Sequence, residues 1–244
     1  MKLIHVAGIQ RTGQHAITSW IIGHYQKVGY RNDTSPSGFV KPFWYFETSK
    51  KETWDVSKKI DLNQDAWIIG SEHVKSKISL HPKLIDQLTD NGFSMDSRIL
   101  LKVMRNPYNQ YASVLNWRYN KILGRVKTFR DTWIAMAKAN EVNYGIAPRL
   151  VKFDDWFSDI NYRKDLSKYI GAEFTDKRLN TVMKIGHNRS WGSSFDGMKQ
   201  NGKAQKMNID KRWKDRFDDP RFQEVWNDKE LEETANEIGF YKPE

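Results

Sequence analysis

Two short segments of the chain combine arginine, glycine and hydroxyl residues in patterns that are typical of phosphate binding. The first, AGIQRTGQHA at positions 7–16, follows an apolar run and contains Arg11 and Gly13. The second, RNPYNQYAS, begins with Arg105 and ends eight residues later with Ser113. Both are candidate anion sites, and their chemistry depends on the elements that hold them.

The first segment is predicted to be a loop between a strand and a helix. Backbone N–H groups of residues 12–15 would then be unpaired at the positive end of the helix dipole, which attracts anions. Arg11 adds a fixed charge, and Gly13 allows the backbone to approach a ligand closely. The segment lacks the G-x-x-x-x-G-K-[ST] spacing of nucleoside triphosphatases, and a tight turn with a surface arginine stays open as an alternative.

The second segment is predicted to leave a strand at Arg105 and to enter a helix. Asn106 suits the N-cap and Pro107 the first helical position, which puts Ser113 about two turns into the helix. An arginine at a strand end and a hydroxyl on the next helix can together hold one phosphate. An ordinary capped helix with a surface arginine explains the same residues.

The elements around these segments alternate between strand and helix. Continuous apolar runs predict strands at residues 2–9, 65–73, 97–105 and 148–154. Helical spacing is found at residues 13–29, 81–92, 106–123 and 129–145, and twice within 210–240, where Leu231, Ala235 and Ile238 form one stripe. The alternation predicts an α/β fold, a P-loop-like three-layer sandwich whose central parallel sheet of four to five strands is flanked by helices. Ligands of such sheets gather at the carboxyl ends of the strands.

The chain length suits one domain spanning residues 1–244. Residues 31–60 are predicted to form a polar connection around the aromatic cluster at 43–45, which either stacks on a sugar or an adenine ring or belongs to the core. Residues 186–208 are rich in Gly, Ser, Asn and Lys and are predicted to form a long loop that serves as a lid.

Composition narrows the function classes. A net charge of +10 favours an anionic ligand, although a solvated basic surface is the simpler explanation. The absence of cysteine excludes disulfides, thiol metal sites and cysteine nucleophiles. The apolar start is too short for a signal peptide, and no stretch approaches the roughly 20 apolar residues of a membrane span. We therefore expect a cytoplasmic protein with no membrane span.

The two phosphate-binding segments resemble the signatures of the sulfotransferase family, whose donor is 3′-phosphoadenosine-5′-phosphosulfate. RTGQHA is similar to the family's Lys/Arg-Ser/Thr-Gly loop, which holds the 5′-phosphosulfate. RNPYNQYAS resembles its Arg-x-Pro signature with a serine eight residues after the arginine, where Arg and Ser bind the 3′-phosphate. LVKFDDWFSD at 150–159 resembles the family's strand that ends in an acidic pair. The resemblance covers about residues 3–159.

The resemblance implies a set of donor-binding residues: Arg11, Thr12, Gly13, Gln14, His15, Ala16, Arg105, Ser113 and Lys206. Lys206 matches only in outline, seven residues before Trp213, and a solvated lysine is an equal alternative. Gln14 and His15 stand where the family commonly has Thr or Ser, so hydroxyl contacts would be lost and backbone contacts kept. His15 either contacts the sulfonate or caps the helix.

An attacking hydroxyl must lose its proton to a base within hydrogen-bond reach. IIGSEHV puts Glu72 and His73 at the carboxyl end of the second predicted strand. Many cytosolic members of the family have Thr-His here, which favours His73 as the base. Members that act on polysaccharides use a glutamate, which keeps Glu72 open. Arg11 would neutralise charge on the leaving phosphate, a transition-state role.

These inferences predict a sulfotransferase that moves the sulfuryl group in line to an acceptor hydroxyl on a carbohydrate or small molecule. The product would be adenosine 3′,5′-bisphosphate, and the reaction would need no metal. The rivals are a P-loop kinase-like phosphotransferase, which would need ATP and Mg²⁺, and a basic nucleic-acid-binding protein, which the mingled Lys, Arg and aromatic residues suggest. We expect a nucleotide donor and a hydroxyl acceptor as partners, and no nucleic acid. A catalytically inactive member of the fold is a third alternative.

Overall fold

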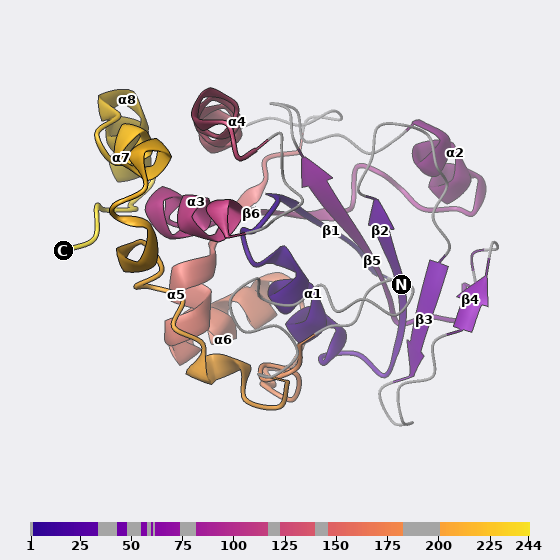
Figure 1. Cartoon of the computed structure of the whole chain (residues 1–244). Helices are drawn as coiled ribbons and strands as arrows, with labels where there is room; N and C mark the ends of the chain where they lie inside the picture. Colours follow the sequence, from indigo (N-terminus) through magenta and orange to yellow (C-terminus); the bar gives the residue numbers. More distant parts are fainter. Residues whose placement is uncertain are drawn as a thin grey trace.

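A computed structural model describes residues 2–33, 43–47, 55–57, 60, 62–73, 82–116, 123–139, 146–182 and 201–244 (Figure 1). The strands are β1 (Lys2–Ile9), β2 (Lys27–Asp33), β3 (Phe43–Glu47), β4 (Asp55–Ser57), β5 (Ala66–His73), β6 (Ile99–Met104) and β7 (Arg149–Lys152). The α-helices are α1 (Gln14–Ile22), α2 (Pro82–Asp90), α3 (Pro107–Leu115), α4 (Val126–Lys138), α5 (Phe153–Ser158), α6 (Ile160–Tyr169), α7 (Pro220–Trp226) and α8 (Lys229–Glu237). The short 3₁₀ helices are η2 (Ala204–Lys206) and η3 (Lys214–Arg216).

The described strands form one sheet in the order β4-β3-β2-β5-β1-β6-β7. The five strands from β2 to β7 in this order are parallel, and β3 and β4 extend the sheet as an antiparallel edge. The predicted α/β fold with a central parallel sheet flanked by helices is confirmed. The two predicted tail helices correspond to α7 and α8, where Leu231 and Ala235 are buried and Ile238 is half-buried.

The helix predicted over 13–29 is wrong in its second half. α1 ends at Ile22, and β2 begins at Lys27 as a parallel neighbour of β5. The period changes here from helical to alternating, since Val28 and Tyr30 are fully buried in the same core cluster and Gly29 between them packs on the Trp67 ring. Residues 31–60, expected as a connection, contain the end of β2 together with β3 and β4.

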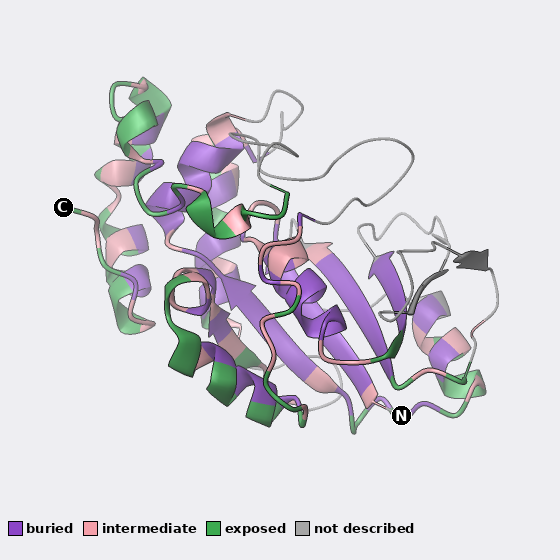
Figure 2. Cartoon of the chain, turned by 90° about the horizontal axis from the view of Figure 1, so that it is seen from below, coloured by how far each residue is buried: buried purple, intermediate pink, exposed green. Residues whose placement is uncertain are grey.

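Helices cover both faces of the sheet. Ile4 and Val6 of β1 share one buried cluster with residues of α1, α5 and α6. Ala7 and Ile9 face the opposite way and belong to a cluster built with α3, α4, α7 and α8. Figure 1 shows these two groups of helices on opposite sides of the sheet, and Figure 2 shows the strands between them as buried. In the described ranges, no helix is both long and apolar enough to cross a membrane.

The carboxyl ends of β1 and β6 form a crevice in this topology. The two strands are adjacent, but the chain leaves β1 toward β2 on one side of the sheet and leaves β6 toward β7 on the other. Connections that diverge in this way open a ligand site at the strand ends. The segment expected to be a strand through residue 154 leaves the sheet earlier, because β7 ends at Lys152 and α5 starts at Phe153. The acidic pair at 154–155 therefore lies in the first turn of a helix beside the crevice.

Candidate functional site

A cavity of about 130 Å³ opens at these strand ends. Its wall comes from parts of the loop and first turn at 10–16, from Glu72 of β5, from Arg105 after β6, from Phe153, Trp156 and Phe157 of α5, and from parts of 179–182 and 204–212. We call the part around Arg11, Gln14, His15 and Glu72 the loop end. We call the part around Arg105, Ser113, Asp154 and Arg212 the clamp end.

The loop end owes its shape to two residues with left-handed backbone. Gly13 has φ 90° and is the N-cap residue of α1, while Arg11 has φ 71°, which is costly for a residue other than glycine. A Cβ on Gly13 would lie 2.3 Å from the ring of Phe153, so the loop packs on α5 without room for a side chain. Thr12 is fully buried, and both its hydroxyl, at 2.9 Å, and its backbone N–H, at 3.3 Å, donate to the carbonyl of Ile9. The prediction of an unpaired backbone N–H is therefore wrong at Thr12.

Gly13, the N-cap residue of α1, has no side chain with which to cap the helix N-terminus. The side chain of Gln14 is almost fully buried and lines the cavity, and within the described residues neither its amide oxygen nor its amide nitrogen has a hydrogen-bond partner. A buried polar group without a partner costs about 1–3 kcal/mol. An uncapped helix start beside an unsatisfied amide suits a polar ligand, and the helix dipole favours a negatively charged one.

Glu72 and His15 meet across the loop end. β5 pairs with β1 in a register that sets Glu72 opposite Gly8, immediately before the loop. The Nε2 of His15 lies 3.0 Å from the Oε1 of Glu72, and the two side chains are 18% and 10% exposed. Burial lowers the pKa of Arg11, and the neighbouring charge of Glu72 opposes that shift. The loop end therefore carries a carboxylate and an imidazole in contact with each other, and a guanidinium within the electrostatic reach of the carboxylate.

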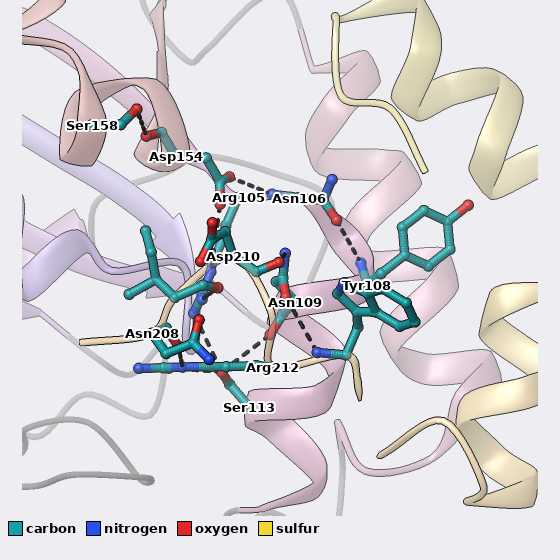
Figure 3. A network of polar contacts seen from close by, with 12 residues as sticks. Arg105, Asn106, Tyr108, Asn109, Ser113, Asp154, Ser158, Asn208, Asp210 and Arg212 are labelled. Carbon is teal, nitrogen blue, oxygen red and sulfur yellow. Dashed lines mark hydrogen bonds and ion pairs between the residues drawn. The ribbon is translucent and has the colours of Figure 1, made fainter. Parts of the chain in front are cut away.

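The clamp end is centred on Arg105, which follows β6 and is almost fully buried. Its guanidinium donates to the Oγ of Ser113 at 3.3 Å and to the carbonyl of Ile209. Its Nε lies 4.0 Å from Oδ1 of Asp154, whose other oxygen accepts from the backbone N–H of Asn106 at 2.8 Å (Figure 3). Arg105 and Ser113, which the sequence assigns to one phosphate, are thus in direct contact with each other.

Arg212 is the residue at the clamp end that the sequence did not reveal. Its guanidinium donates to the Oγ of Ser113 at 3.0 Å and to the carbonyl of Asn208 at 3.1 Å, and the side chain is 5% exposed (Figure 3). Asn109 of α3 fixes the segment by donating to the carbonyl of Asp210 at 3.0 Å. Lys206 is exposed on η2 and does not line the cavity. Arg212, one residue before Trp213, therefore lines the cavity, whereas Lys206, seven residues before it, does not.

The charges at the clamp end are poorly compensated by the protein alone. Burial lowers the pKa of Arg105 to about 10, an effect that Arg11 reinforces and that Asp154 opposes. Burial also raises the pKa of Asp154, against the attraction of Arg105. Both shifts express the cost of holding charge away from water. An anionic ligand that contacts Arg105 would lower that cost for the guanidinium.

An aromatic wall from α5 lies between the two ends. Phe153, Trp156 and Phe157 line the cavity, with the rings of Phe153 and Trp156 stacked at 5.7 Å between centroids. The guanidinium carbon of Arg105 lies 5.3 Å from the centre of the Phe153 ring. Met207 and Ile209 also line the cavity. Such a surface suits a flat, apolar group between two charged ones.

The other predicted residues have varied positions. Ala16 lines the cavity, whereas Thr12 and Ser113 are buried behind it and act on it through their neighbours. His73 is the last residue of β5, and its side chain lies outside the described residues, as do the side chains of the aromatic cluster at 43–45. Of the loop predicted over 186–208, only residues 201–208 are described, and they include η2. Among described residues, no group of three or more His, Asp or Glu side chains is arranged to hold a metal ion.

No family model, no curated protein and no solved structure matches the chain.

Proposed function

We propose that the protein is a sulfotransferase that uses 3′-phosphoadenosine-5′-phosphosulfate as donor and an alcohol or sugar hydroxyl as acceptor. The observation that carries the proposal is the spacing of two arginine sites across one cavity with an aromatic wall between them. In a nucleotide with phosphate groups on both its 3′ and 5′ carbons, the ribose separates the two anions and carries the flat base on C1′, so the aromatic wall would pack against that base. The resemblance of both arginine segments to the family's signatures supports the same donor.

The clamp end fits the 3′-phosphate. Arg105 and Arg212 converge on one hydroxyl, that of Ser113, from segments about one hundred residues apart. Two guanidinium groups and a hydroxyl match the charge and the acceptor oxygens of a phosphate monoester. In this proposal Arg212 makes the third phosphate contact, which the family resemblance assigned to Lys206.

The loop end fits the phosphosulfate. The uncapped start of α1 offers backbone donors, Arg11 offers a charge, and Gln14 offers an unpaired amide. In the reaction, the acceptor oxygen forms a bond to sulfur while the bond from sulfur to the phosphate oxygen breaks. Arg11 stabilises the negative charge that grows on the leaving phosphate. As in phosphoryl transfer, most of the acceleration would come from positioning and charge stabilisation.

Glu72 is the better supported of the two candidate bases. Its carboxylate lines the cavity at the loop end, where the sulfuryl group would be held. A carboxylate within hydrogen-bond reach of the attacking hydroxyl can accept its proton as the new bond forms. His73, one residue further along β5, remains the alternative on the family resemblance.

A transfer assay with ³⁵S-labelled donor tests the function. The protein is incubated with the labelled donor and with panels of phenols, alkyl alcohols, neutral sugars and anionic polysaccharides, in buffer that contains EDTA. The proposal predicts labelled product with at least one panel and a loss of product in Arg105→Ala. Transfer of phosphate from ATP that depends on Mg²⁺, with no transfer of sulfate, would instead assign the protein to the kinase-like alternative.

A further inference from the structure

His15 has a contact that the proposed donor site does not require. Its position in the loop suggests a ligand contact, yet its Nε2 is directed to the Oε1 of Glu72 at 3.0 Å. The partner lies on a different strand, and the β1–β5 register brings the two together by setting Glu72 beside Gly8. Both side chains line the cavity. The helix that binds the donor is thereby joined to the candidate base.

The electrostatic setting decides which way the hydrogen bond runs. His15 is in the first turn of α1, where the helix dipole disfavours a positive charge and favours a negative one nearby. A carboxylate has only acceptor atoms, so in this contact Nε2 of His15 donates to Glu72 and the carboxylate lies near the positive end of the helix. Among the described residues, Arg11 from the loop and Tyr30 from β2 also interact electrostatically with Glu72, and Tyr30 is fully buried.

We infer that His15 is a positioning residue that holds the carboxylate of Glu72 ready to accept the proton of the attacking hydroxyl. The inference rests on the proposed function. As the acceptor oxygen bonds to sulfur and the sulfur–oxygen bond of the donor breaks, the proton moves to the Glu72 carboxylate and the electron pair leaves with the phosphate. His15 exchanges no proton with the substrate in this scheme. It fixes one carboxylate oxygen so that the other is directed to the acceptor.

Two variants of His15 test this role, and they differ in whether residue 15 can donate a hydrogen bond to Glu72. His15→Gln keeps an N–H donor at a similar reach, and His15→Leu replaces the ring with an apolar group. Glu72→Gln removes the base, and the double variant His15→Leu with Glu72→Gln removes both. Binding of adenosine 3′,5′-bisphosphate to each variant by calorimetry reports whether the donor site is intact, because this product lacks the sulfuryl group.

The inference predicts that substitution of His15 lowers the turnover number and leaves nucleotide affinity nearly unchanged. His15→Leu lowers kcat about 10- to 100-fold, part of the 10²–10⁴-fold that a general base supplies, while bisphosphate affinity changes less than about threefold. His15→Gln recovers most of the activity. Removing a donor from a carboxylate makes the carboxylate easier to protonate, so the acidic limb of the kcat–pH profile moves to higher pH in His15→Leu. The double variant is no slower than Glu72→Gln alone.

Two results would overturn the inference while leaving the donor assignment in place. One is full turnover with an unchanged pH profile in His15→Leu. The other is a double variant whose loss is the product of the two single losses, because His15 would then act independently of Glu72. A wild-type protein that neither binds the bisphosphate nor transfers sulfate removes the proposed function itself and the inference with it.

Discussion

The two ends of the cavity are built in opposite ways. The loop end is mostly local, because residues 8–16 supply its backbone donors, its arginine and its imidazole within one strand–loop–helix unit. The clamp end is assembled from distant parts, since Arg105 follows β6, Ser113 belongs to α3 and Arg212 precedes η3. A local site depends on backbone conformation, and an assembled one depends on the packing of the whole domain.

The carboxylates at the two ends also differ. Glu72 lines the cavity and contacts His15, so it can face a substrate. Asp154 lies beside Arg105, does not line the cavity, and accepts a hydrogen bond from the backbone of Asn106. Under the proposed function, proton transfer therefore belongs to Glu72 at the loop end, and Asp154 at the clamp end positions Arg105.

Truncation of Arg105 should have the largest effect on nucleotide affinity. The effect should depend on whether the nucleotide has a 3′-phosphate, which distinguishes the clamp end from the loop end. Arg105→Ala removes one partner of a buried charge pair, a change that costs about 2–5 kcal/mol, so bisphosphate affinity falls at least about 30-fold. Adenosine 5′-monophosphate, which has no 3′-phosphate, loses much less. Calorimetry with both nucleotides measures the difference, and circular dichroism checks the fold. An equal loss for both nucleotides would contradict the assignment of the 3′-phosphate to this end.

Arg212 and Lys206 offer a matched pair for the clamp end. Arg212→Ala removes a charge-assisted hydrogen bond worth about 1.5–3 kcal/mol, so bisphosphate affinity falls roughly 10- to 100-fold. Lys206→Ala changes an exposed lysine outside the cavity wall and leaves affinity within about twofold. Fluorescence titration of both variants is sufficient. The reverse order of effects would return the third phosphate contact to Lys206.

Gly13 and Gly202 offer a matched pair for the loop end. Both have positive φ, at 90° and 83°, but an added Cβ meets the Phe153 ring only at Gly13 and meets nothing within 4 Å at Gly202. Gly202→Ala should cost the backbone strain alone, about 1–2 kcal/mol. Gly13→Ala should cost about 1–3 kcal/mol more because α5 must shift. Urea unfolding gives both values, and equal costs would show that the loop does not depend on its packing against α5.

The smallest expected effect concerns the pH dependence of stability at the clamp end. Burial raises the pKa of Asp154 in the folded protein above its unfolded value, so the folded state binds more protons within that pH window. The free energy of unfolding therefore falls as pH rises through the window. Asp154→Asn removes this contribution and should flatten the curve above about pH 4, measured by urea unfolding at stepwise pH. A variant curve parallel to that of the wild type would mean that Asp154 does not titrate abnormally.

The contrast between the ends also explains what the sequence could reveal. The loop at 7–16 was recognisable because glycine, arginine and the following helix are adjacent in the chain. Arg105 and Ser113 were recognisable because they belong to one strand–helix unit. The position of Arg212 could not be recognised, because its hydrogen bond to Ser113 spans 99 residues and depends on how the C-terminal segment packs on α3. The contact of His15 with Glu72 likewise needs the β1–β5 register, which composition and spacing do not contain.

The fold was predictable to a similar depth. Continuous apolar runs predicted β1, β5, β6 and β7, and their alternation with helices predicted a parallel sheet. β2 was hidden because Ile17, Ile21 and Tyr25 continue the helical spacing beyond Ile22, where α1 ends. The period changes only at Val28, and the pairing of β2 with β5 then favours the strand. Tertiary pairing thus overrides local spacing at that point.

Calorimetric titration with adenosine 3′,5′-bisphosphate in the presence of EDTA tests the central claim most directly. We predict saturable one-to-one binding that Arg11→Ala and Arg105→Ala each weaken, with Arg11→Ala also weakening binding of adenosine 5′-monophosphate. Absence of binding to the bisphosphate, or binding that neither arginine variant changes, would contradict the account of a two-ended nucleotide site.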